Sequence, residues 1–260
     1  MESYLKNFEN DNIMVEFLGV PGTGKTTISH MVSKSLSKNG VHVHEPTYAM
    51  NSMGKTRRQY TKILSIIKVF LIAPRTCIYA IKLIIPSQQK SLKDFIKTVI
   101  NLLFIIFIIK SCSNKKGVHI LDQGFFQAIW SIEYSANHHI EGIKINKLRK
   151  MVYSKPLLVI DIHAVHTEVL QRLNLRETNY SRVEKEFLNS LTEQHIQLSY
   201  EIINRLKDEI QEGWNKEKDL ELISLNNDTE ELLYANTDII TEYILSLLNK
   251  STLSNTNKIH

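Results

Sequence analysis

Residues 19–26 read Gly19-Val20-Pro21-Gly22-Thr23-Gly24-Lys25-Thr26 and match the pattern G-x-x-x-x-G-K-[ST]. An apolar, β-favouring run precedes them at 13–18, and apolar residues recur at helical spacing over 28–36. A strand, a glycine-rich loop and a helix in this order form the context in which the pattern binds phosphate. The glycines let successive N–H groups point inward, and the helix presents its positive end to an anion. The segment therefore predicts a binding loop for a nucleoside triphosphate.

The polar side chains of this loop indicate how the triphosphate would be held. Lys25 can reach the β- and γ-phosphates, and the Thr26 hydroxyl can ligate Mg²⁺. We therefore expect ATP and Mg²⁺ as ligands. The residues expected to contact the nucleotide here are Gly19, Gly22, Thr23, Gly24, Lys25, Thr26 and Thr27.

Length and composition favour one globular unit. The chain has 260 residues, which suits a single α/β domain with an insertion, and 43% of them are hydrophobic, enough for a sizeable core. The two cysteines, Cys77 and Cys112, provide no disulfide framework. The polar segment 1–12 does not resemble a secretory signal. We expect a cytoplasmic protein.

Short apolar stretches alternate with helical ones along the chain. Strands are predicted at 13–18, 41–44, 118–121, 157–160 and 220–225, and helices at 26–38, from about 167, at 187–212 and at 229–248. This alternation predicts a three-layer α/β/α fold around a five-stranded, mainly parallel sheet. We expect one domain over 1–250, with a helical insertion at about 51–117 and a polar tail at 251–260.

Acidic residues follow three of the predicted strands, namely Glu45, Asp122 and Asp161. Ligands of parallel sheets gather at the carboxyl ends of the strands, so these carboxylates should lie near the phosphate loop. A carboxylate there could take a hydroxyl proton as general base, or orient a water on Mg²⁺. The alternative is that Glu45 caps the turn before Pro46 and that Asp161 caps its strand. Asp122 is the first candidate for catalysis and for the metal, because it ends an apolar strand adjacent to the loop.

At these motifs the chain resembles the P-loop nucleoside and nucleotide kinases, most closely the thymidylate-kinase-like group. The matching motifs are the phosphate loop, Glu45-Pro46, Asp122, residues 171–176 with 181–184, and residues 222–227. The resemblance implies phosphoryl transfer from Mg·ATP to a small hydroxyl or monophosphate acceptor. It also implies an arginine-bearing lid, whose arginines here would be Arg172, Arg176 and Arg182.

Mobile arginines of this kind would close over the phosphates and exclude water, which discourages hydrolysis. The alternative is a solvated helix face with ion pairs, for instance to Glu177 or Glu184. The chain departs from the family at Gln123, which stands where the family has arginine, and in its longer, more apolar insertion. These departures make a lipid-linked or sugar phosphate an alternative to thymidine monophosphate as acceptor.

Charge is concentrated in the insertion. Residues 55–116 contain thirteen Lys/Arg and one acid, Asp94, giving +12, so the remainder carries 5 − 12 = −7. The most apolar stretches, 63–85 and 98–109, lie in the same segment. Neither predicts a membrane span, because charges and a proline interrupt the first and the second has twelve residues between Lys97 and Lys110, against the ~20 that a helix needs. Three interpretations stay open: a buried helical insertion whose lysines reach solvent, a pocket for an anionic acceptor, or a face resting on an anionic membrane.

Other features leave further alternatives. Phe125, Phe126, Trp130 and Tyr134 recur at helical spacing and predict either core packing or a platform for an acceptor ring. The pairs His42/His44 and His163/His166 have no third ligand nearby in sequence, so we expect no zinc site. The main competing function is a P-loop ATPase that acts as a switch or motor rather than a kinase, with a membrane surface as one place of action. Nucleic acid is not the expected partner, and a homodimer stays open.

Overall fold

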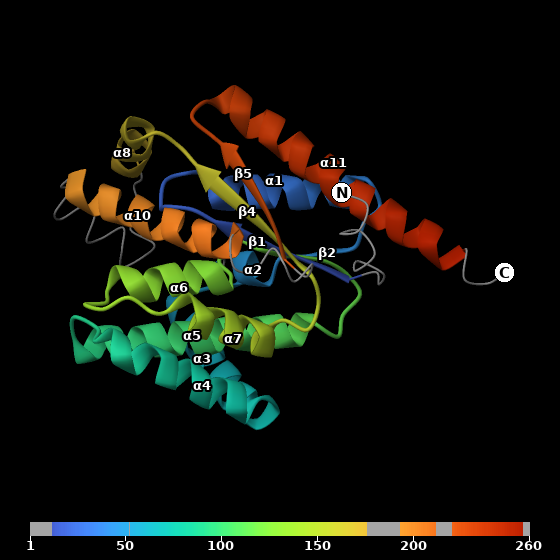
Figure 1. Cartoon of the computed structure of the whole chain (residues 1–260). Helices are drawn as coiled ribbons and strands as arrows, with labels where there is room; N and C mark the ends of the chain where they lie inside the picture. Colours follow the sequence, from blue (N-terminus) through green and yellow to red (C-terminus); the bar gives the residue numbers. More distant parts are fainter. Residues whose placement is uncertain (1–11, 52, 176–192, 212–219, 257–260) are drawn as a thin grey trace.

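The computed structural model describes residues 12–51, 53–175, 193–211 and 220–256. Within them one sheet runs in the order β2-β3-β1-β4-β5, and all neighbouring strands are parallel. The strands are β1 (Asn12–Leu18), β2 (Val43–His44), β3 (Gly117–Leu121), β4 (Leu157–His163) and β5 (Leu220–Asn226). Helices cover both faces of the sheet (Figure 1). The predicted three-layer α/β/α fold with five parallel strands is confirmed.

Strand β1 is central and buried along its whole length, which explains its apolar sequence. Alternate side chains point to opposite faces of the sheet. Ile13, Val15 and Phe17 pack under α1 (Lys25–Lys38) and α11 (Glu230–Thr256), whereas Met14 and Leu18 belong to the larger core on the other face. On that second face α6 (Phe125–Tyr134) packs against β1 and α10 (Glu193–Glu209) packs against α6, while α7 (Gly142–Val152) lies lower, against the insertion. Helix α8 (His166–Asn174) follows β4 and contributes Val169 and Leu173 to the same core.

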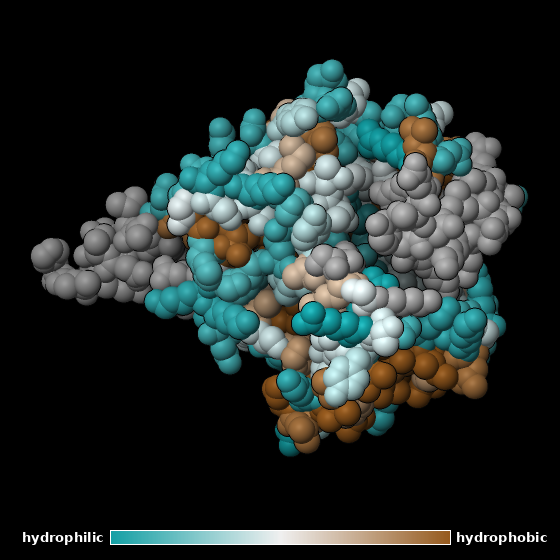
Figure 2. Space-filling model, turned by 180° about the vertical axis from the view of Figure 1, so that it is seen from behind, coloured by the Kyte–Doolittle hydropathy of each residue, from teal (hydrophilic) through white to brown (hydrophobic). Residues whose placement is uncertain are grey.

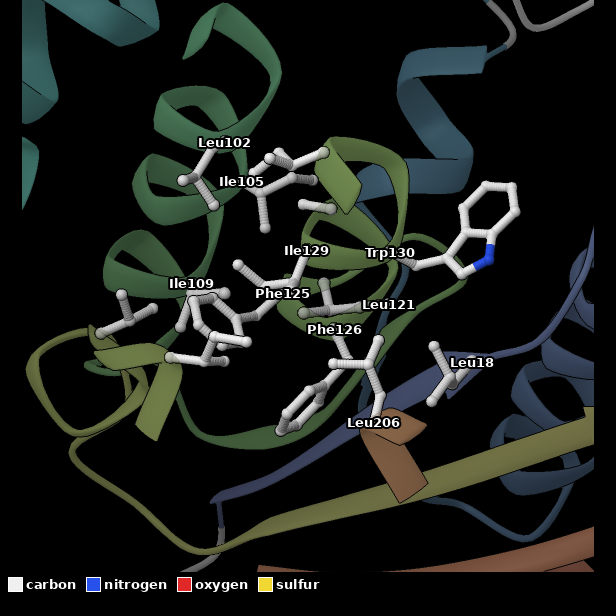
Figure 3. Packing of buried hydrophobic residues seen from close by; sticks show 14 of the residues in the cluster. Leu18, Leu102, Ile105, Ile109, Leu121, Phe125, Phe126, Ile129, Trp130 and Leu206 are labelled. Atoms are coloured by element: carbon white, nitrogen blue, oxygen red, sulfur yellow. The ribbon is translucent and has the colours of Figure 1, made fainter. Parts of the chain in front are cut away.

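The insertion is the connection between β2 and β3. It consists of α2 (Pro46–Asn51), α3 (Lys55–Ile72), α4 (Pro74–Ile84), the short 3₁₀ turn η2 (Ile85–Ser87) and α5 (Leu92–Cys112). Helix α5 lies between α6 on one side and α3 and α4 on the other. Figure 3 shows Leu102, Ile105 and Ile109 of α5 beside residues of α6. The insertion is therefore an extra layer of helices on one face of the domain.

Helix α5 is long and apolar enough to cross a membrane, and α3 with α4 pass the same test as a pair bent by 114°. Half of the most apolar part of α5 is buried by protein, however, and its apolar side chains from Leu102 to Ile109 belong to the main core or pack against it. Packing accounts for the composition of α5. The outer surfaces of α3 and α4 are different and are considered below.

Several element ends differ from the predicted ones. Strand β2 begins at Val43 rather than at 41, and β4 continues past 160 to His163 because it stays paired with β5. Helix α11 extends to Thr256, although we expected a helix end near 248 and a polar tail from 251. Polar residues alone do not end a helix, and residues 249–256 contain no glycine or proline.

Candidate functional site

The phosphate loop connects β1 to α1 in a conformation that depends on glycine. Gly19, Gly22 and Gly24 have φ values of 149°, 97° and 93°, a region that residues with a side chain rarely adopt. A Cβ on Gly19 would lie 2.2 Å from the carbonyl oxygen of Ile162, and one on Gly24 would lie 2.5 Å from Nδ2 of Asn227. The glycines thus permit both the turn and the close approach of neighbouring loops.

Lys25 is the first residue of α1 and is 9% exposed. Its ammonium donates to the carbonyl oxygen of Val20 at 2.9 Å, and that carbonyl also accepts from the hydroxyl of Thr23 at 3.0 Å. The loop therefore closes around one backbone oxygen, with the ammonium held beside the start of the helix. The N-terminus of α1 has no side-chain cap, so its positive end is available to an anion.

Thr26 and Asp122 come together as the sequence suggests. The Thr26 hydroxyl donates to Oδ2 of Asp122 at 3.2 Å, and the Asp122 main-chain N–H donates to the Thr47 hydroxyl at 3.2 Å. Asp122 is buried, and its Oδ1 has no hydrogen-bond partner among the described residues. An exposed hydroxyl beside a carboxylate with an unsatisfied oxygen is an all-oxygen donor set that fits Mg²⁺.

Glu45 lies at the same edge of the sheet, between β2 and α2. Its two carboxylate oxygens are 3.2 and 3.1 Å from Nδ1 of His30 on α1. The His30 ring stacks on Tyr48, with 4.0 Å between centroids. Through the neighbouring Thr47, this segment also contacts the end of β3. The structure thus ties Glu45 to the helix that follows the phosphate loop.

Arg172 on α8 is held by the loop after β5. Its guanidinium donates to the carbonyl oxygens of Asn227 and Asp228 at 2.8 and 2.9 Å. The Asn227 side chain in turn donates to the carbonyl oxygen of Thr23 at 2.7 Å. Arg172 therefore fixes a loop that touches the phosphate loop, a role that sequence reasoning missed. Arg176 and Arg182, the other two arginines of the predicted lid, lie outside the described residues.

Asp161 is not at a strand end, because β4 continues to His163. Its buried carboxylate lies 2.6 Å from the ammonium of Lys207 on α10. The interpretation as a strand cap is therefore wrong, and Asp161 is one half of a buried ion pair between sheet and helix. Thr27 lies exposed on the first turn of α1, beside Thr26.

Glu16 is the residue in this region that sequence reasoning did not single out. It lies in the middle of β1, fully buried, and its Oε1 accepts from the main-chain N–H groups of Phe126 and Gln127. Its Oε2 accepts from the Tyr153 hydroxyl at 2.8 Å. Burial raises the pKa of Glu16 to about 7, although these hydrogen bonds act in the opposite direction. An acidic residue within an apolar strand was the signal available in the sequence.

This carboxylate is linked to the phosphate loop through α6. Oε1 of Gln127, on the first turn of α6, accepts from the main-chain N–H of Gly19 at 3.3 Å. A Cβ on Gly124 would lie 2.3 Å from the Glu16 carboxyl carbon, so glycine is required where the chain enters α6. Glu16 thus anchors the start of α6, and Gln127 of this helix contacts the phosphate loop.

The aromatic candidates of α6 belong to the main core, and the two histidine pairs lie at β2 and at the end of β4. Phe125, Phe126, Trp130 and Tyr134 are all buried, which confirms core packing, and Figure 3 shows the first three within the main cluster. The His44 ring packs edge-on against His42 and stacks on His119, with centroids 4.4 and 4.8 Å apart. Burial lowers the pKa of both His44 and His119. Within the described part of the chain, no group of three or more His, Cys, Asp or Glu is arranged to hold a metal.

The whole structure is similar to solved structures of two kinds of kinase. A deoxyadenosine kinase from M. mycoides is similar over 90% of this chain and 100% of its own, with a TM-score of 0.52 and 12% identity. Thymidylate kinase from Candida albicans is similar over 92% of this chain and 93% of its own, with a TM-score of 0.51 and 14% identity. The chain has the fold of these kinases. No protein-family model and no curated protein matches its sequence.

The topology of the sheet explains why these residues cluster. The phosphate loop, Asp122 and Glu45 come from three separate segments and meet at the carboxyl edge of the parallel sheet. This edge is where open parallel sheets bind ligands. The arrangement provides an ammonium, a helix N-terminus and an oxygen pair suited to a cation, which together can hold and polarise a phosphate chain.

Proposed function

We propose that this chain is an ATP-dependent phosphotransferase, a small-molecule kinase that moves the γ-phosphate of Mg·ATP to a hydroxyl or monophosphate acceptor. The observation that carries the proposal is the pairing of Thr26 with Asp122 beside Lys25, at the carboxyl edge of a sheet with the P-loop kinase fold. Each element alone is compatible with other functions. Their meeting at one edge is what a phosphoryl-transfer site requires.

Catalysis of phosphoryl transfer is mostly positioning and electrostatic stabilisation, because the transferred group spreads negative charge over its oxygens. Lys25 would leave the Val20 carbonyl, which it contacts at 2.9 Å, and donate to the phosphates. Thr26 and Asp122 would hold Mg²⁺, which supplies fixed positive charge against the phosphate oxygens. The main-chain amides at the start of α1 would bind the β-phosphate side of the chain.

The role of Glu45 depends on the acceptor. With a hydroxyl acceptor, its carboxylate is the candidate general base, and His30 at 3.1 Å would keep it oriented. With a monophosphate acceptor no base is needed, and Glu45 would position the acceptor instead. A substitution of Glu45 therefore distinguishes the two kinds of acceptor. Only transfer to a hydroxyl should lose its general base and with it the rate of the chemical step.

Nucleosides and nucleoside monophosphates are the first acceptors to test, because deoxyadenosine kinase and thymidylate kinase share the fold. Sugar phosphates and polyprenyl phosphates come next, because Gln123 stands where the thymidylate-kinase-like group has arginine. A panel of these compounds with γ-labelled ATP reports transfer directly. Release of labelled inorganic phosphate in the same reactions reports hydrolysis.

Lys25→Ala is the central variant, and Lys34→Ala on the exposed side of the same helix is its matched control. Removing one pre-organised donor from a developing negative charge costs at least about 100-fold in rate. We expect that loss, with weaker Mg·ATP binding in calorimetry, for Lys25→Ala only. Equal behaviour of the two variants would refute the proposal. Hydrolysis without transfer to any acceptor would instead support the P-loop ATPase alternative.

A further inference from the structure

Helix α3 exposes its more apolar side. The face that it turns toward α5 contains Ser65 and Val69, both buried, together with Lys62, whose ammonium lies 5.0 Å from the centre of the Phe104 ring. The opposite, exposed face carries a stripe at helical spacing, made of Tyr60, Ile63, Leu64, Ile67, Phe70 and Leu71. A helix on the surface of a water-exposed domain normally shows the reverse arrangement. The exposed side of α3 therefore has the composition of a surface that is covered by an apolar partner.

The apolar surface continues beyond α3. It extends to Ile72 and, on α4, η2 and the first turns of α5, to Ile78, Ile85, Leu92 and Ile96. Eleven of the sixteen large apolar side chains that are exposed among the described residues fall between 60 and 96. Figure 2 shows a brown area along the lower edge of the molecule, where Figure 1 draws the insertion helices. We call this area, from Tyr60 to Ile96, the insertion face. Concentrations of this kind mark interaction sites.

Basic side chains accompany the insertion face. Seven lysines and arginines between residues 57 and 97 are exposed, namely Arg57, Lys68, Arg75, Lys82, Lys90, Lys93 and Lys97. Asp94 is the only acid between 55 and 116, and it is half-buried. A partner for this surface must therefore be apolar in its interior and negatively charged at its boundary. An anionic lipid bilayer has both properties, with acyl chains below a layer of phosphate groups.

A second copy of the chain fits this surface less well. In a two-fold symmetric dimer each patch meets its own copy, so the basic side chains would face one another. The geometry also argues against a complete span. Helices α3 and α4 meet at a bend of 114° and pack against α5, α4 also against α7, with Val69, Cys77 and Ala80 buried, so only their outer sides are free. A bent pair of this kind can lie in the interface with its apolar side chains among the acyl chains.

We propose that the insertion face docks this protein onto the surface of an anionic membrane, with α3 and α4 lying in the plane of the headgroups. Lysines and arginines at the boundary bind lipid phosphates, and the stripe from Tyr60 to Leu71 enters the acyl layer. This inference goes beyond the proposed kinase activity and does not depend on it. Lys25→Ala protein should bind membranes as the unaltered chain does.

Flotation of the full chain with lipid vesicles tests the inference directly. We expect binding to vesicles of phosphatidylcholine mixed with phosphatidylglycerol, weaker binding to phosphatidylcholine alone, and a decrease as salt is raised. The apolar variant is Ile63→Asn/Ile67→Asn/Leu71→Asn. Its control, Ile143→Asn/Val165→Asn/Ile239→Asn, alters exposed apolar residues outside the insertion. Only the first should lose membrane binding by tenfold or more, with unchanged circular dichroism. Leu71→Asn alone provides a version that cannot disturb the core, because Leu71 is 81% exposed.

The basic boundary is tested by Lys68→Gln/Lys82→Gln, with Lys34→Gln/Lys38→Gln on α1 as the matched control. Each charge removed near an anionic surface should weaken binding by about fivefold. Absence of binding to anionic vesicles, or equal losses in the variants and their controls, would overturn the proposal. A lipid-free dimer in light scattering that the Ile63/Ile67/Leu71 variant dissociates would also overturn it, in favour of a second copy.

Discussion

The buried carboxyl of Glu16 should make the stability of this protein fall as the pH rises from about 4.5 to about 7. Burial raises its pKa from the ordinary 4.5 to about 7. Between these values the folded chain binds a proton that the unfolded chain has released, so raising the pH favours unfolding. The contribution is complete below about pH 4.5 and is lost above about pH 7. At about 1.4 kcal/mol for each pH unit, the change amounts to about 3 kcal/mol.

Glu16→Gln removes this dependence while keeping the shape of the side chain. The amide oxygen can still accept from the N–H groups of Phe126 and Gln127, and the amide nitrogen can donate to the Tyr153 hydroxyl. At about pH 5, where the carboxyl is neutral, the variant should be within about 1 kcal/mol of the unaltered chain. At about pH 8 it should be more stable, by an amount approaching 3 kcal/mol, because no charge is buried.

Urea unfolding followed by circular dichroism at the two pH values measures these differences. Comparing variant with unaltered chain cancels the titration of every other group. Glu242→Gln, an exposed acid on α11, serves as the control and should show the same small difference at both pH values. A difference between Glu16→Gln and the unaltered chain that does not change with pH would refute the reasoning, and so would a variant that is less stable at the higher pH.

Three further substitutions test the contacts around the site. Gly124→Ala should lower the free energy of unfolding in urea by more than about 2 kcal/mol, because its methyl group would lie 2.3 Å from the Glu16 carboxyl carbon. An unchanged free energy would show that the start of α6 has room for a side chain. Lys207→Met should cost about 3 kcal/mol, since it leaves the buried Asp161 carboxylate without its cation, and a loss under about 1 kcal/mol would contradict a structural ion pair. Asn227→Ala should weaken calorimetric Mg·ATP binding by about tenfold without loss of fold, because its amide bonds the phosphate loop at 2.7 Å, whereas unchanged affinity would show that the loop keeps its shape unaided.

The parts of this structure that could be predicted are those with a local signature. The phosphate loop was predicted because glycines at fixed spacing report a local backbone conformation. The sheet followed because apolar strands of a buried parallel sheet form continuous apolar runs. Asp122 was expected near the phosphate loop because ligands gather where parallel strands end. Asp122 and the loop follow β3 and β1, which are neighbours in the sheet, with Glu16 of β1 opposite Leu121 of β3. The Thr26 hydroxyl accordingly contacts Asp122.

The parts that could not be predicted depend on contacts between distant segments. The expectation that Arg172 belongs to a lid stays a prediction, and the sequence did not indicate its hydrogen bonds to Asn227 and Asp228, which join residues 55 and 56 positions apart. Asp161 seemed to end its strand because the apolar run ends there, whereas the strand continues through its pairing with β5. The sequence shows which residues are polar. It does not show which partner, 40 or more positions away, satisfies them, as for Lys207 and Asp161.

In the insertion, the composition of a helix does not by itself show whether the helix is buried or exposed. Both α3 and α5 are apolar and flanked by lysines, so composition alone assigns them the same environments. Packing separates them, because α5 is enclosed by α3, α4 and α6 while α3 has neighbours on one side only. Helices α3 and α4 are thus the outermost layer, separated from the sheet by α5 and α6, and the phosphate loop lies at the edge of that sheet. Docking through α3 and α4 would therefore leave the edge with the phosphate loop uncovered, so the proposed nucleotide exchange with water could continue on the membrane.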